Sequence, residues 1–225
     1  MYAFAYRILY FPVNLISSAL RPVLFYETAL KGVRRLEEQI NAILKWLVII
    51  VTPFVVLYLF YSRFLFRVFF GERWSDAGFM GVFIIFPVFT FLFCNWMDRI
   101  MDVLGKQKLT LFLEIFFASL SITGLWLGFW LNLGMIGALL MQCIVLVTYN
   151  ITYLYIVYSV ANFDKLGLYN LLCRSLMWAS ICTMILFILN KFTSDIVATC
   201  SYPIIVMLIL LCYGKLQQVR TEKKH

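Results

Sequence analysis

The sequence predicts an all-α integral membrane protein, a bundle of about seven transmembrane helices. Of its 225 residues, 64% are hydrophobic and only 13% are charged, whereas soluble domains are about half apolar and about one quarter charged. The apolar residues run from one end of the chain to the other. These observations exclude a soluble enzyme, a nucleic-acid-binding module, a disordered tail and a single-span anchor.

Charge-free stretches locate the individual spans. A helix needs roughly 20 mostly apolar residues to cross about 30 Å of hydrocarbon, where only its own backbone supplies hydrogen-bond partners. The stretch 115–163 is too long for one crossing and is divided at Asn132, Gly134 and Gly137, residue types that favour a turn. The expected helices cover residues 2–25, 43–62, 77–102, 109–130, 136–159, 169–189 and 196–213.

Basic residues are distributed unevenly between the two ends of these helices. When successive connections between the helices are assigned in turn to opposite sides of the membrane, fourteen of the 19 Lys and Arg residues fall on one side. Because cytoplasmic loops are rich in Lys and Arg, that side and the C-terminus are predicted to be cytoplasmic, and the N-terminus lies outside. A chain that starts at Met1 on the outer edge of a helix, without a signal peptide, suggests that further helices precede it. The five residues on the opposite side are Arg7, Arg63, Arg67, Arg73 and Lys191.

Residues that form catalytic or metal sites are sparse. The six cysteines are scattered without a CxxC pair, and the single histidine is His225 at the C-terminus. The sequence contains no phosphate-binding glycine loop, zinc-protease motif or Ser/His/Asp set. It therefore predicts no enzyme activity, no metal site and no cofactor.

Four stretches resemble one family, the polysaccharide and lipid-linked oligosaccharide (O-antigen) flippases of the multidrug/oligosaccharidyl-lipid/polysaccharide exporter superfamily. They occur in the family's order and at its spacing, and the match corresponds to helices eight to fourteen of a fourteen-helix member. The stretches are AFAYRILYFPVNLISSALRPVLF (3–25), FGERWSDAG (70–78), VLGKQKL (103–109) and LGMIGA (133–138).

The resemblance implies that the chain is the C-terminal half of a two-lobe transporter in a bacterial or archaeal cytoplasmic membrane. Its substrate would be an oligosaccharide linked to an isoprenoid diphosphate, and its partners would be membrane lipid and a missing N-terminal lobe or second subunit. No nucleic acid is implied. The alternatives are a drug or metabolite cation antiporter of the same superfamily, and a non-transporting subunit or remnant. A membrane-embedded transferase is the weakest alternative, because no substantial soluble loop carries His or paired Asp.

One group of polar residues closes the expected helix 77–102. Asn95, Asp98, Arg99 and Asp102 are offset by three, four and seven residues, which places them on one helical face. Charged groups near the membrane usually face a wet cavity or each other. The face is thus either a substrate-cavity candidate or a set of ion pairs that includes Lys106.

The other cavity candidates occur singly or in one stripe. Glu114 could take up a proton, bind a cation or snorkel toward the neighbouring basic turn. Arg7 could hold a lipid diphosphate or act as an interfacial anchor. Gln142, Tyr149 and Asn150 lie in a polar stripe that could bind sugar hydroxyls, although hydrogen bonds between helices explain Gln142 and Asn150 equally well.

Overall fold

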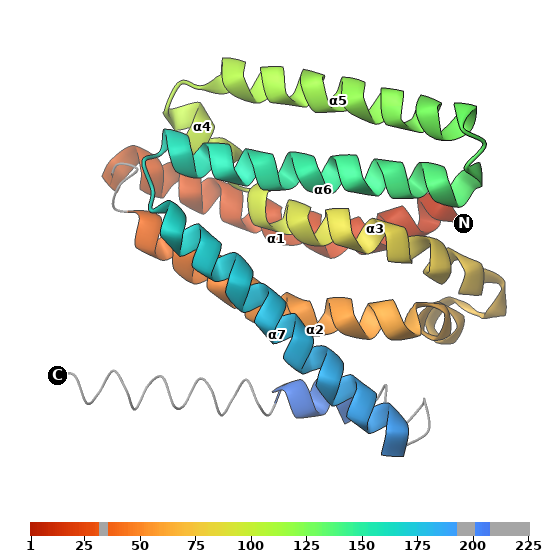
Figure 1. The fold of residues 1–225 in the computed structure, drawn as a ribbon. Coiled ribbons are helices and arrows are strands. Elements are labelled where there is room, and N and C mark those ends of the chain that lie inside the picture. Colours follow the sequence, from red (N-terminus) through yellow and green to blue (C-terminus); the bar gives the residue numbers. More distant parts are fainter. Residues whose placement is uncertain (32–35, 193–200, 208–225) are drawn as a thin grey trace, which may run out of the picture.

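The computed structural model describes residues 1–31, 36–192 and 201–207, and these ranges contain helices and turns but no strand. The ribbon is shown in Figure 1. A short 3₁₀ turn, η2 (Glu72–Trp74), precedes α3, and residues 201–207 are also helical. The α-helices are α1 (Tyr2–Lys31), α2 (Glu37–Phe70), α3 (Ser75–Cys94), α4 (Asp98–Val103), α5 (Gln107–Trp130), α6 (Gly134–Val160) and α7 (Lys165–Phe192).

Helix α3 lies at the centre of the bundle. It packs against α1, α2 and α6, while α5 adds to the outer side of α6, and α7 runs alongside the first half of α2 before the two diverge (Figure 1). Half of the most apolar window of α3 is buried inside the protein, against 17% for α5. The outer helices therefore present most of their apolar side chains to the surroundings, as a bilayer allows and water does not.

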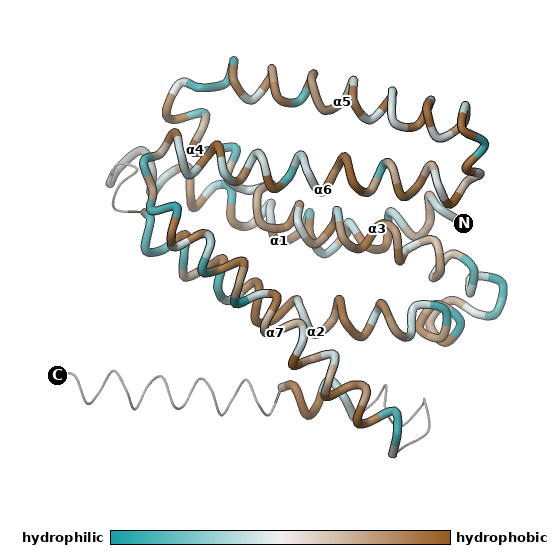
Figure 2. The backbone as a smooth tube through the Cα atoms, in the orientation of Figure 1, coloured by the Kyte–Doolittle hydropathy of each residue, from teal (hydrophilic) through white to brown (hydrophobic). Residues whose placement is uncertain are grey.

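Within the described residues, six helices are long and apolar enough to cross a membrane: α1, α2, α3 with η2, α5, α6 and α7. Figure 2 shows hydrophobic residues along their length and hydrophilic residues gathered toward their ends. The all-α membrane bundle is thus confirmed. The seventh expected span, 196–213, lies largely outside the described residues.

The helices alternate between two ends. We call the end where α1, α4 and α6 finish and where α2, α5 and α7 begin the basic end, because it carries Arg21, Lys45, Lys106, Lys165 and Arg174. The division of 115–163 into two spans is confirmed. Its turn places Asn132 and Gly134 at positive φ (53° and 67°), whereas Gly137 lies within α6.

The expected continuous helix 77–102 is wrong, because the chain turns at residues 95–97 between α3 and α4. The indole N–H of Trp96 donates to the carbonyl of Leu92 at 2.9 Å. In an uninterrupted helix that carbonyl would accept the backbone N–H of Trp96. The side chain takes the acceptor and the helix ends, but Asn95 and Asp98 still face the same way, because Arg21 contacts both side chains.

Helix α2 continues past the expected end at residue 62. Tyr61 has non-helical angles (φ −120°, ψ 21°), and the segment after this kink turns away from the main axis of α2 (Figure 1). Arg63 lies over the ring of Phe79 at 4.7 Å. Arg67 pairs with Glu72 at 3.8 Å. These two basic residues of the opposite end thus have local partners.

Helices α2 and α3 touch at Gly78. A Cβ atom there would overlap the carbonyl oxygen of Ser62 and lie 2.8 Å from its carbonyl carbon. The hydroxyl of Tyr58 donates to the carbonyl of Gly78 at 3.0 Å. The absence of a side chain at Gly78 therefore sets the distance between the two helices.

Candidate functional site

A cluster of charged and polar side chains joins α1 to the α3–α4 turn at the basic end. We call Arg21, Asn95, Asp98, Arg99 and Asp102 the Arg21 cluster. The guanidinium of Arg21 donates to the backbone carbonyl of Asn95 at 2.9 Å and to its side-chain oxygen at 2.8 Å, and pairs with Asp98 at 3.2 Å. Arg99 donates to Asp102 at 2.9 Å and lies 3.9 Å from Asp98.

Two arginines and two aspartates make the Arg21 cluster electrically balanced. Their side chains are about one third exposed, between 33% and 42%, so each pair is partly solvated. The expected pairing of Arg99 with Asp102 is confirmed, and Arg21 is the partner of Asp98 that the sequence did not predict. The cluster can hold α1 against the helix break, and a phosphate could reach the exposed edges of the two guanidinium groups.

One carboxylate oxygen of Asp98 is buried and accepts no hydrogen bond among the described residues. Tyr153 lies near it, and the hydroxyls of Tyr153 and Thr110 interact with each other. Buried polar atoms usually find a partner, so the Asp98 oxygen marks a place where water or a polar ligand group would be accommodated.

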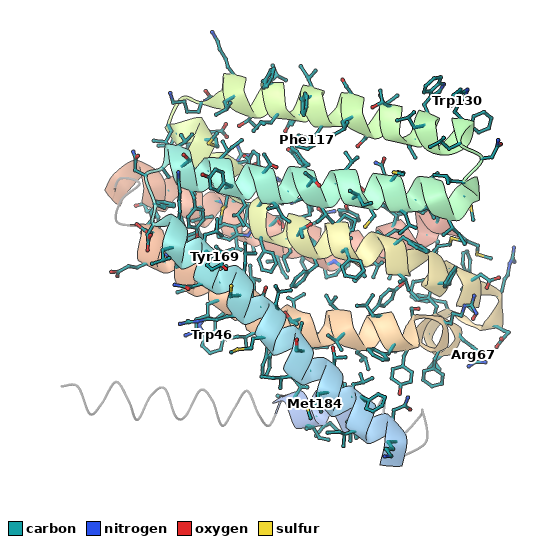
Figure 3. All side chains as sticks on the ribbon, in the orientation of Figure 1. Trp46, Arg67, Phe117, Trp130, Tyr169 and Met184 are labelled. Atoms are coloured by element: carbon teal, nitrogen blue, oxygen red, sulfur yellow. The ribbon has the colours of Figure 1, made fainter. Side chains whose placement is uncertain are left out.

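The polar stripe expected on α6 is divided between different neighbours. Gln142 lines a small pocket with Tyr2, Tyr6 and Tyr10 of α1, and its side-chain oxygen is buried without a partner in the described part of the chain. Tyr149 instead packs toward α5, with its ring centroid 5.3 Å from that of Phe117, which is labelled in Figure 3. Gln142 and Tyr149 therefore do not share one site.

Asn150 joins α6 to α3. Its amide nitrogen donates to the carbonyl of Pro87 at 3.1 Å and to the hydroxyl of Thr90 at 2.9 Å, and its oxygen accepts the Cys94 thiol at 3.5 Å. Asn150 is only 3% exposed. Its polar atoms are thus engaged between helices, as one of the two sequence interpretations predicted.

Arg7 and Glu114 lie apart from the Arg21 cluster. Both side chains are exposed, Arg7 near the start of α1 and Glu114 on the outer helix α5. The structure therefore does not bring the nine candidates into one cavity. Among the described residues, no group of three or more His, Cys, Asp or Glu side chains could hold a metal ion.

An apolar groove of about 760 Å³ runs between α1, α2 and α3, and Pro203 also borders it. Ile16 of α1 and Leu92 of α3 line it toward the basic end. Among the described lining residues, only Tyr58 has a polar side-chain atom, and its hydroxyl donates to the carbonyl of Gly78. The groove thus suits an apolar chain and offers nothing to a polar ligand.

The Arg21 cluster lies just beyond the basic end of this groove. Arg21 follows Ile16 by five residues on α1, about 7.5 Å along a helix axis at 1.5 Å per residue. Asn95 follows Leu92 by three residues. Sequence reasoning missed Arg21, although it is the one charged residue between Arg7 and Glu27 in a predicted span.

The fold and composition define a multi-pass, all-α membrane protein. Residues 1–78 match the model of a family described as polysaccharide biosynthesis protein. The matched region covers α1, α2 and the beginning of α3, and it includes the first two of the four stretches on which the flippase resemblance rests. Comparisons with curated proteins and with solved structures gave no match. The family match supports a role in polysaccharide biosynthesis.

Proposed function

We propose that this bundle is one half of a transporter that moves oligosaccharides linked to an isoprenoid diphosphate across the cytoplasmic membrane, toward the outer leaflet. The observation that carries the proposal is the apolar groove with the Arg21 cluster at its basic end. The long apolar tail of such a substrate would lie in the apolar groove, and its charged head would lie at the Arg21 cluster. The similarity of residues 1–78 to polysaccharide biosynthesis proteins supports the oligosaccharide.

The energetic task of such a transporter is to shield the head group. Moving an isolated charge through hydrocarbon costs tens of kcal/mol on an idealised scale. A polar passage between two helical lobes removes most of this cost, and rocking of the lobes opens it to alternate sides. An inside-negative potential favours outward movement of each negative charge by about 2.3 kcal/mol per 100 mV. The second lobe is part of the proposal, because one bundle leaves a passage open to lipid.

The proposal is tested by filling the apolar groove. Val51 is half-buried and lines the groove, so Val51→Trp would occupy it. The matched control is Ile144→Trp, on the exposed face of α6. Each variant is expressed in a strain of the source organism from which the gene for this protein has been deleted. Surface polysaccharide is measured, together with the membrane leaflet in which the lipid-linked oligosaccharide is found.

We expect the deletion and Val51→Trp to accumulate lipid-linked oligosaccharide in the cytoplasmic leaflet, while Ile144→Trp restores surface polysaccharide. The amount of each variant in the membrane is measured alongside, so that loss of protein is recognised. Normal surface polysaccharide in the deletion strain, or in cells with a full amount of Val51→Trp, would refute the proposed function.

A further inference from the structure

A second groove, of about 310 Å³, lies at the basic end within the first three turns of α2 and α7. We call it the α2–α7 groove. Four of its lining side chains are cationic or carry amides: Asn41, Lys45, Asn170 and Arg174. No carboxylate lines it among the described residues. This combination of charge and hydrogen-bond donors matches a phosphate group.

The structure orients one of the amides toward the groove. The hydroxyl of Tyr158 donates to the side-chain oxygen of Asn41 at 2.6 Å, which leaves the amide nitrogen as the group available to a ligand. That nitrogen faces Gly167, where an added Cβ would lie 3.8 Å from it and equally far from a carboxylate oxygen of Asp164. At Gly167 the groove thus meets an amide donor and an acidic acceptor, and Gly167 itself contributes no side chain.

The nearest acidic groups are engaged in holding the groove walls together. Glu37 of α2 accepts the backbone N–H of Asp164 at 2.7 Å, and Asp164 accepts the N–H of Leu166 at 2.9 Å at the start of α7. These bonds fix the α6–α7 turn against α2. Both carboxylates keep their negative charge beside the groove, while Lys45 and Arg174 supply the positive charge of the lining itself.

Aromatic and apolar neighbours place the groove at the level of lipid headgroups. Trp46 follows Lys45 directly in the chain, and Tyr169 directly precedes Asn170. Both aromatic side chains are exposed, Trp46 at 47% and Tyr169 at 64% (Figure 3). Trp and Tyr favour the membrane–water interface. Farther from the basic end, α7 exposes Leu176 at 71%. A lipid whose anionic headgroup lies in the groove would therefore have room for its acyl chains along α7.

We propose that the α2–α7 groove binds the phosphate of an anionic phospholipid. Basic pockets between transmembrane helices attract such headgroups, and a zwitterionic headgroup gains less because its own cation meets Lys45 and Arg174. The exposed apolar surface beside the groove favours a lipid over free phosphate. This site is separate from the apolar groove and does not depend on the proposed transport.

The test uses the full chain in detergent, with lipid binding measured by native mass spectrometry. Dioleoylphosphatidylglycerol, dioleoylphosphatidylcholine, an isoprenyl monophosphate and inorganic phosphate are titrated separately. The variants are the double change Lys45→Gln with Arg174→Gln, and Gly167→Leu, which fills the groove and keeps both charges. The control is Lys108→Gln, an exposed cation of α5 outside the groove.

We expect phosphatidylglycerol to bind about tenfold more tightly than phosphatidylcholine, with about tenfold loss in the double variant and in Gly167→Leu but no change in Lys108→Gln. Helix content and elution volume show that each variant is folded, and Gly167→Leu serves if the double variant is not. Equal binding of the two phospholipids, or unchanged binding by folded Gly167→Leu, overturns the proposal. So does tighter binding of the isoprenyl phosphate, or inorganic phosphate that displaces phosphatidylglycerol.

Discussion

Replacing Gly78 by Ala tests whether the contact between α2 and α3 determines the stability of the bundle. The added Cβ would meet the backbone of Ser62, which cannot rotate away as a flexible side chain would. Overpacking of this kind costs about 1–3 kcal/mol, and a rigid neighbour favours the upper part of that range. Against it stands a gain of about 1 kcal/mol in helix propensity. We expect Gly78→Ala to be less stable by about 1–2 kcal/mol.

Gly124→Ala is the matched control, because it makes the same change within α5 without a clash. A Cβ at Gly124 would lie 3.8 Å from Val145, an ordinary contact. This variant should gain up to about 1 kcal/mol. Reversible unfolding of both variants is followed by far-ultraviolet circular dichroism in mixed micelles as the denaturing detergent is increased. If Gly78→Ala proves as stable as Gly124→Ala, the close approach does not constrain the bundle.

Three further outcomes are expected. In a cysteine-free background, a cysteine at Lys106 should be labelled only from the cytoplasm and one at Asn132 only from outside; the opposite pattern reverses the orientation. Asn150→Leu should reduce stability by about 1–1.5 kcal/mol in the same unfolding assay, since interhelical hydrogen bonds in membranes average about 0.6 kcal/mol each; an unchanged midpoint would remove its role as a tether. Arg21→Gln should lower the unfolding midpoint. The double variant Arg21→Gln with Asp98→Asn should recover part of the loss, because it leaves no uncompensated carboxylate. No recovery would mean that the ion pair between these two residues does not contribute to stability.

The spans could be predicted from the sequence because lipid imposes a minimum length of apolar helix. The same reasoning located the turn at Asn132, where the chain must reverse direction and a small polar residue tolerates positive φ. The helix break at Trp96 could not be predicted from composition. It depends on a side-chain donor that competes with the backbone for the carbonyl of Leu92.

The candidate site was only partly predictable, because its parts come together through packing between distant segments. Arg99 and Asp102 are three residues apart, so their ion pair follows from helix geometry. Arg21 and Asn95 are separated by 74 residues, and no local pattern announces their contact. The α2–α7 groove likewise depends on how α7 packs along α2, which hydropathy does not specify.

The central position of α3 has a consequence for the order in which the membrane bundle is assembled. Helices α1 and α2 precede α3 in the chain, so its first two neighbours are already made when it is synthesised. Its third neighbour, α6, arrives later as the second arm of the α5–α6 hairpin. The carbonyl of Pro87 and the hydroxyl of Thr90 therefore receive their hydrogen bonds from the amide of Asn150 only after α6 has been made. The face of α3 that will receive α6 is therefore open to lipid during this interval.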